Sequence, residues 1–308
     1  MTFLKPKILE SGDVVRVVAS SSAFDEDSLW RGIEALESLG LTVRYQKNIF
    51  AKHAALPYLA GTDQRRYQEL KAALTDDDTK AIFFARGGYG AMRLIPFFEA
   101  DSFARLKPKI IAGLSDVTAL HLYFQKRFRW TVFYAPVVGG NMGQLQNPES
   151  FLSLQKNLMQ NQQLGPLRFR ELHVVKKGVA TAPLVGGCLT LVAGSLGTPY
   201  EINTDDKILF LEDVGETPYQ IDRLLMQLKM AGKFKKCCGV ILGPLVGSTH
   251  PANDYINTIR DVLSDIAGPV VMNFPTGHVA KSITLPLGAR ITLTTKTKTV
   301  DFLESALR

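Results

Sequence analysis

Cysteines and long apolar runs are both scarce in this chain. Its 308 residues include only three cysteines, Cys188, Cys237 and Cys238, which fits the reducing cytoplasm. The strand-like run after Cys238 favours small buried apolar side chains at positions 237 and 238 over a redox pair. The longest apolar stretches are only a few residues long, whereas a membrane span requires about 20. The sequence therefore predicts no transmembrane helix.

The first residues lack the apolar core of a secretory signal, because Pro6 and several charged residues interrupt them. We therefore expect a cytoplasmic protein, provided that the chain is not an already processed form. The five histidines show no metal-ligand spacing such as His-Glu-x-x-His. Accordingly, neither a metal site nor a cofactor is expected.

The net charge of +7 raises the question of a nucleic-acid partner. Lysines and arginines are spread through the chain, and the densest cluster, at residues 229–236, is interrupted by apolar residues and a glycine. No nucleic-acid-binding module is recognisable. A mild positive field that favours a small anionic substrate is the simpler interpretation. We expect neither nucleic acid nor membrane as a partner.

A chain of this length predicts two domains. In the first part, short apolar strands such as residues 14–19 and 81–85 alternate with segments of helical periodicity. This alternation is typical of a parallel sheet covered by helices on both faces. The expected first domain is residues 1–145.

The composition changes at the glycine- and amide-rich segment 139–148, where we place the domain boundary. A linker is expected at residues 146–167 and a second domain at residues 168–308. This second domain is predicted to be smaller and rich in short strands, one of them at residues 184–191. The sequence indicates one clear helix there, from Pro218 to about residue 230.

Ser115 lies on a predicted turn between a strand and a helix. Residues 110–112 have strand character, the strand breaks at Gly113, and from Val117 onward apolar residues recur at helical spacing. A serine at such a turn is pushed out of the backbone, and the first N–H groups of the helix point at the group that it attacks. This geometry suits a nucleophile. Alternatively, Ser115 or Asp116 merely caps the helix.

A nucleophilic serine needs a base and an acidic group that orients the base. His278 follows a strand and lies in a loop shaped by proline and glycine, where it can face a cleft. His121 lies on the helix after Ser115 and is expected to point away. Glu212 and Asp213 stand at the end of an apolar strand, where a carboxylate can be partly desolvated. The alternative is that both acids simply begin a solvated loop.

The glycine loop, residues 86–90, lies between a strand and a helix. Such a loop lets backbone N–H groups approach a ligand oxygen, but it lacks the Lys-Ser/Thr of a P-loop and the full dinucleotide-binding spacing. By itself, the motif is equally compatible with a ligand cradle and with a tight structural turn.

Several motifs occur in a fixed order along the chain. They are Arg86-Gly-Gly-Tyr-Gly90, Gly113-Leu-Ser-Asp116, Leu211-Glu-Asp213 with Pro218 and Arg223 downstream, and Gly277-His278 with Thr284-Leu-Pro-Leu-Gly288. In order and approximate spacing they resemble the LD-carboxypeptidase family of serine peptidases, which includes the microcin C self-immunity peptidases. The resemblance spans nearly the whole chain.

The resemblance implies a flavodoxin-like, class I glutamine amidotransferase-like α/β domain, a β-rich C-terminal domain, and an active site between them. It further implies a triad in which Ser115 is the nucleophile, His278 the base and Glu212 the acid that orients it. The backbone N–H groups of Gly88 and Asp116 correspond to the oxyanion donors. Family members are often dimers, so a homodimer is expected.

The implied reaction is release of D-Ala from the murein tetrapeptide L-Ala-γ-D-Glu-meso-diaminopimelate-D-Ala during cell-wall recycling. The carboxylates of this peptide agree with the positive net charge. Arg86, beside the glycine loop, is a candidate for binding a substrate carboxylate, because a guanidinium can do so in a bidentate way. The alternative for Arg86 is a structural ion pair under the loop.

Two other functions stay open. One is hydrolysis of peptide-linked aminoacyl nucleotides, as in the immunity branch of the family. An aromatic platform for the adenine would then be expected between the domains, yet residues 139–183 contain only Phe151 and Phe169 as aromatics. The other is a non-catalytic α/β protein whose two domains close on a small ligand.

Overall fold

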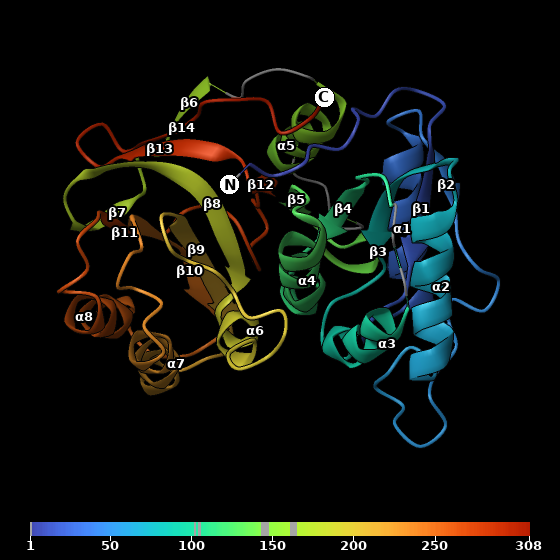
Figure 1. Cartoon of the computed structure of the whole chain (residues 1–308), viewed down its shortest axis with the longest axis horizontal. Helices are drawn as coiled ribbons and strands as arrows, with labels where there is room; N and C mark the ends of the chain where they lie inside the picture. Colours follow the sequence, from blue (N-terminus) through green and yellow to red (C-terminus); the bar gives the residue numbers. More distant parts are fainter. Residues whose placement is uncertain (1, 102, 104–105, 143–147, 161–164) are drawn as a thin grey trace.

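Two β-sheets lie side by side in the computed structural model (Figure 1). The structure describes residues 2–101, 103, 106–142, 148–160 and 165–308. Residues 143–147 of the expected boundary segment and residues 161–164 of the expected linker lie outside the described residues.

The first sheet has the strand order β12-β5-β4-β3-β1-β2. Its members are β1 (Val14–Val18), β2 (Thr42–Arg44), β3 (Thr79–Phe84), β4 (Ile110–Gly113), β5 (Val132–Tyr134) and β12 (Leu285–Leu287). The first five are parallel to one another, and β12 is antiparallel to β5. Because β4 is buried along its whole length, it is apolar on both faces, as a central parallel strand must be.

Helices cover this sheet, and α1 and α2 begin at polar capping residues. They are α1 (Glu26–Glu37), α2 (Asp63–Thr75), α3 (Ile95–Ala100) and α4 (Thr118–Phe128), with short turns at Ala91–Leu94, Ser115–Val117 and Val138–Met142. The Thr62 side chain, for example, accepts a hydrogen bond from the backbone N–H of Arg65 at the start of α2.

The second sheet has the strand order β6-β14-β13-β8-β9-β10-β11-β7. Its members are β6 (Gly165–Arg168), β7 (His173–Lys176), β8 (Val179–Cys188), β9 (Ile208–Val214), β10 (Gly239–Val246), β11 (Val270–Met272), β13 (Arg290–Thr294) and β14 (Thr299–Phe302). Strands β8 to β11 are parallel, and the outer pairs are antiparallel. The predicted fold class, a parallel-sheet domain followed by a second, strand-rich part, is confirmed.

The second part contains more helix than the sequence indicated. Beside the predicted α7 (Pro218–Met230), it has α6 (Leu189–Gly194) and α8 (Ala252–Val262). The expected strand at residues 184–191 is therefore wrong at its end, since β8 stops at Cys188. A six-residue helix is too short to show a period. Helix α8 was predictable from the sequence, because its buried residues recur at helical spacing.

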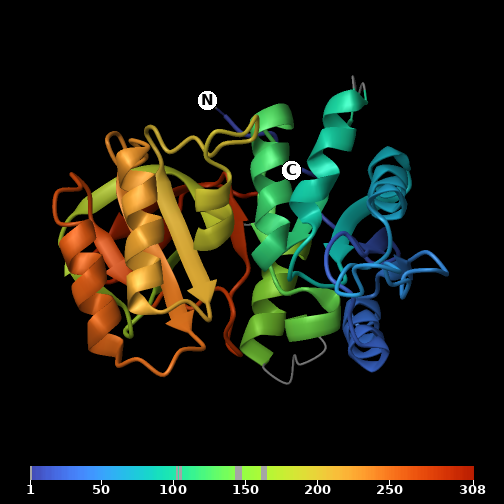
Figure 2. The same cartoon turned by 90° about the horizontal axis from the view of Figure 1, so that it is seen from below.

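Two elements join the halves of the molecule. Helix α4 packs on both α6 and β8, and Figures 1 and 2 show it between the two sheets. Strand β12, from the C-terminal part, completes the first sheet beside β5. The segment before β12 is fastened to α5 (Pro148–Met159), where the N–H groups of Ser282 and Thr284 donate to the hydroxyls of Ser150 and Ser153, each at 3.0 Å. None of the helices in the described ranges is long and apolar enough to cross a membrane.

Candidate functional site

Ser115 lies on the turn that follows β4 and has a left-handed backbone conformation, with φ at 64°. A non-glycine residue rarely adopts this conformation, so the surrounding structure must hold it there. The side chain of neither Ser115 nor Asp116 caps the turn Ser115–Val117 or α4, the helix that follows it. Instead, the Asp116 carboxylate accepts a hydrogen bond from the backbone N–H of Ala91 at 2.7 Å. The geometry therefore fits the strained serine turn and not the capping alternative.

The glycine loop lies directly against this serine. A Cβ atom on Gly87 would stand 2.8 Å from Ser115 Cβ, so only glycine allows the two chains to approach so closely. The next residue, Gly88, is exposed and has a φ of 90°. Within the described part of the chain, neither Gly88 N–H nor Asp116 N–H has a protein acceptor. Both groups are available to a ligand oxygen beside Ser115.

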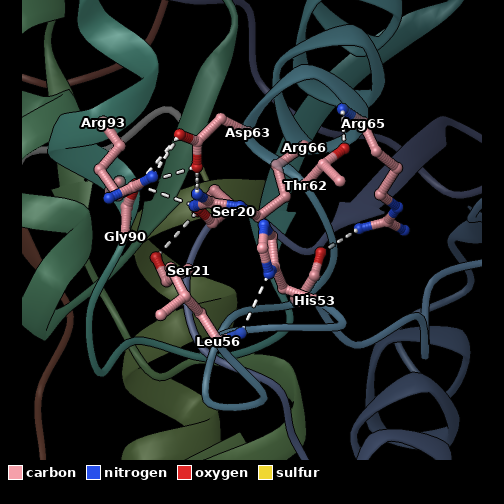
Figure 3. A network of polar contacts seen from close by, with 12 residues as sticks. Ser20, Ser21, His53, Leu56, Thr62, Asp63, Arg65, Arg66, Gly90 and Arg93 are labelled. Atoms are coloured by element: carbon pink, nitrogen blue, oxygen red, sulfur yellow. Dashed lines mark hydrogen bonds and ion pairs between the residues drawn. The ribbon is translucent and has the colours of Figure 1, made fainter.

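The loop is held in place by the segment after β1 and by α2. Ser22 N–H donates to the Gly87 carbonyl at 3.2 Å, and Tyr89 N–H donates to the Ser22 hydroxyl at 3.0 Å. Arg66, a fully buried residue of α2, donates to the carbonyl oxygens of Gly90, at 2.8 Å, and Ser20. Figure 3 shows Arg66 between these two segments. An arginine in a helical pattern, here beside Arg65, gives no sequence signal for this role.

Asp63 forms ion pairs with two arginines, Arg66 and Arg93. Its carboxylate pairs with Arg66 on one side and with Arg93, at 2.7 Å, on the other (Figure 3). Asp116 is fully buried. Burial raises the pKa of the Asp116 carboxyl to about 6, although its hydrogen bonds and the charge of Arg66 act in the opposite direction. The nucleophile turn and the glycine loop are thus connected by a buried carboxyl group.

Glu212 and His278 are in direct contact, although 66 positions separate them. Glu212 Oε2 accepts from the backbone N–H of His278 at 3.0 Å and lies 2.8 Å from its Nδ1. The glutamate is fully buried and the histidine is partly exposed. A Cβ atom on Gly277 would overlap this carboxylate, which explains the glycine before the histidine.

Asp213, the acid that follows Glu212 in β9, makes a different contact. Asp213 accepts from both the backbone N–H and the hydroxyl of Thr190, each at 2.8 Å, and so fastens the start of α6 to β9.

Burial by itself lowers the pKa of His278. The hydrogen bond and charge of Glu212, together with the charge of Asp213, outweigh burial, so the pKa of His278 lies above its ordinary value.

Tyr134, at the end of β5, links the glutamate to the serine turn. Its hydroxyl donates to Glu212 Oε1 at 2.5 Å and accepts the backbone N–H of Ser115 at 3.1 Å. Burial, followed by the charge of Glu212, raises the pKa of this phenol well above its ordinary value, so it remains a donor. No sequence pattern indicates this role for Tyr134, because a tyrosine in a buried strand is indistinguishable from a core residue.

The remaining candidates lie apart from this chain of contacts. His121 is fully buried below Tyr134, with 6.3 Å between the ring centroids, and burial lowers its pKa to about 3. Arg86 is exposed and donates to the Ala23 carbonyl at 2.6 Å. Arg86 has no ion pair with any described residue, so the structure does not contain the alternative contact under the loop.

Two family models match the chain. The LD-carboxypeptidase N-terminal domain matches residues 15–135, and the LD-carboxypeptidase C-terminal domain matches residues 181–293. The chain belongs to the LD-carboxypeptidase family. The N-terminal match contains Ser115 and Tyr134, and the C-terminal match contains Glu212 and His278.

Relatives and solved structures agree with this assignment. The probable murein peptide carboxypeptidase of Bacillus subtilis is 35% identical over 96% of this chain and 93% of that protein. A muramoyltetrapeptide carboxypeptidase from Oxalobacter formigenes has the same fold, with a TM-score of 0.79 and 25% identity over 93% of this chain and 98% of that one. The microcin C7 self immunity protein MccF has a TM-score of 0.87 over 99% of this chain and 100% of that one, at 24% identity. This LD-carboxypeptidase family member is a peptidase of the carboxypeptidase type.

Proposed function

We propose that the protein is a serine LD-carboxypeptidase that removes the terminal D-Ala from murein tetrapeptide in cytoplasmic cell-wall recycling. The observation that supports this proposal is the contact chain from Ser115 through Tyr134 and Glu212 to His278. It joins a strained serine turn to an imidazole whose orientation a buried carboxylate fixes. These are the parts that acyl transfer by a serine requires.

In the proposed reaction, Ser115 Oγ forms a bond to the carbonyl carbon of the diaminopimelate residue while His278 Nε2 takes the hydroxyl proton. His278 Nδ1 faces Glu212 Oε2 at 2.8 Å, and this contact leaves Nε2 as the basic nitrogen. The carbonyl oxygen becomes an oxyanion and accepts from the N–H groups of Gly88 and Asp116. Removal of one such donor in comparable enzymes costs about 3 kcal/mol of barrier.

The C–N bond then breaks, and His278 returns its proton to the amine of the departing D-Ala. A water molecule attacks the remaining acyl ester while His278 takes a proton from it. Breaking of the ester bond, with that proton passing to Ser115 Oγ, releases the tripeptide and restores the enzyme.

The direct test is mass-spectrometric detection of D-Ala released from purified murein tetrapeptide. The wild-type protein is compared with Ser115→Ala and with Ser38→Ala, an exposed serine after α1 as the matched control, and a chelator is added in parallel. We expect release by the wild type and Ser38→Ala alone, undisturbed by the chelator. A folded wild-type protein that releases no D-Ala would contradict the proposal, and peptide-linked aminoacyl nucleotides would be the next substrates to assay.

Arg86 is proposed to bind a substrate carboxylate, since its guanidinium is exposed beside the glycine loop and has no anionic protein partner among the described side chains. Arg86→Ala should raise the KM for the tetrapeptide and leave kcat near the wild-type value. Steady-state kinetics measure both constants. Unchanged kinetics would remove Arg86 from the substrate site.

A further inference from the structure

A cavity of about 430 Å³ opens beside the glycine loop. Arg86, Lys52, Tyr58, Phe24, Asp25 and Ser22 are among the residues that line it. Ser22 connects the cavity with the glycine loop. It lines the cavity, and its backbone N–H and hydroxyl bind Gly87 and Tyr89 of the glycine loop. The cavity therefore begins next to Gly88, the proposed oxyanion donor.

The charges around this cavity favour an anion. Lys52 is exposed and, among the described residues, has neither an ion pair nor a hydrogen-bond partner. Arg86 donates one N–H to the Ala23 carbonyl at 2.6 Å, which fixes the guanidinium and leaves its other donors available. The single acid, Asp25, has a carboxylate that already accepts the backbone N–H of Ser28 at 2.9 Å as the N-cap of α1.

The size of the cavity indicates which part of a substrate it holds. About 430 Å³ is far more room than one alanine needs. On a tetrapeptide cut before its last residue, only the acyl side is that large. The exposed ring of Tyr58, 6.3 Å from that of Tyr89 between centroids, supplies an apolar wall for such a chain.

We propose that this cavity is the acyl-side subsite and that Lys52, together with Arg86, binds the free α-carboxylate of the D-glutamyl residue. The assignment rests on the proposed murein peptidase function and names a second basic residue, from the loop between β2 and α2, as a determinant of specificity. Lys52 and Arg86 act on binding and not on the chemical step, because neither touches the triad.

The kinetic test uses two tetrapeptides that differ only at the D-glutamyl α-carboxyl group, which is free in one and amidated in the other. For the free acid, Lys52→Met should raise KM about fivefold, the value of a partly exposed ion pair, with kcat unchanged. For the amide, the same variant should behave as the wild type. Lys235→Met, which removes an exposed lysine of the second domain, is the control for net charge and should change neither substrate.

A binding measurement separates this proposal from the proposed function. Calorimetry with Ser115→Ala and the tripeptide L-Ala-γ-D-Glu-meso-diaminopimelate requires no turnover, and adding Lys52→Met should weaken binding about fivefold. Equal effects of Lys52→Met on the acid and the amide, or no effect on either, would overturn the subsite while leaving the peptidase intact. A wild type that cleaves neither peptide would overturn the peptidase, and the calorimetric result would still decide the subsite.

Discussion

The hydroxyl of Tyr134 lies 2.5 Å from Glu212 Oε1 and donates a hydrogen bond to that carboxylate. The same oxygen accepts the backbone N–H of Ser115 at 3.1 Å. Tyr134 comes from the first sheet and Glu212 from the second, so one phenol connects the nucleophile turn with the acid that orients the base. The relative position of the two sheets is thereby coupled to the geometry of the proposed triad.

Tyr134→Phe should lower kcat about 10- to 100-fold with little change in KM. The substitution keeps the ring and removes one hydrogen bond to a buried carboxylate, a contact worth about 1.5–3 kcal/mol. Glu212 would retain its contacts with His278 but lose the donor at Oε1. Steady-state kinetics on the tetrapeptide measure the two constants, and urea unfolding shows how much of the loss is structural.

Tyr255→Phe is the matched control for that experiment. Tyr255 is also buried, and its hydroxyl also makes two hydrogen bonds, to the Glu216 carbonyl at 2.8 Å and to Ser248 Oγ at 2.6 Å. It lies outside the contact chain of the proposed triad. We expect both variants to lose similar amounts of stability and only Tyr134→Phe to have a reduced kcat. Equal kcat values in the two variants would show that Tyr134 is only a packing residue.

The pH dependence of kcat/KM should reflect the contact between Glu212 and His278. The base must be neutral, and its pKa lies above the ordinary value of 6.5. Activity should therefore fall with decreasing pH through a midpoint above 6.5. In Glu212→Gln the negative charge is gone, so the midpoint should move to lower pH while kcat drops on the order of 10³- to 10⁴-fold. An acidic limb at the same pH in both proteins would argue against this pairing.

Local patterns were sufficient to predict the parallel strands of the first sheet and the serine turn. The break at Gly113, followed by helical spacing, marks a strand–turn–helix unit without knowledge of any distant contact. The same is true of α7, where Pro218 marks the start of the helix. Such signals lie within a few residues of the feature that they specify.

These local patterns could not predict tertiary contacts. The placement of β12 in the first sheet depends on its pairing with β5, more than 150 positions earlier in the chain. The choice between Glu212 and Asp213 likewise depends on which acid meets His278 and which meets Thr190. From the residues alone the two acids were equivalent, and only the resemblance to a family favoured Glu212.

Arg66→Met should lower the free energy of unfolding by about 3 kcal/mol and also reduce kcat. The variant leaves the buried carbonyls of Ser20 and Gly90 without this donor and removes one partner of Asp63. Arg93→Met is the control, because Arg93 pairs with the same Asp63 from a partly exposed position and should cost less than about 1 kcal/mol. Chemical unfolding and tetrapeptide kinetics measure the two effects. Equal, small losses would mean that Arg66 does not hold the glycine loop.

The buried carboxyl of Asp116 should make the free energy of unfolding depend on pH, and the substitution Asp116→Asn should remove this dependence. Burial raises its pKa from 3.8 to about 6, so the folded state binds this proton more tightly than the unfolded chain does. The resulting stabilisation is complete below pH 3.8 and is lost as pH rises through about 6. The linkage corresponds to about 3 kcal/mol in total.

Asp116→Asn keeps an oxygen that can accept the Ala91 N–H and abolishes the titration. The free energy of unfolding of the variant, minus that of the wild type, should therefore increase between pH 4 and pH 7, towards a change of about 3 kcal/mol. Urea unfolding at several pH values gives this difference, in which all other titrating groups cancel. A difference independent of pH would show that Asp116 titrates alike in the folded and unfolded chains. Because the backbone N–H at position 116 survives, the variant also separates the side chain from the proposed oxyanion donor: activity at pH 8 should persist if only the N–H is needed.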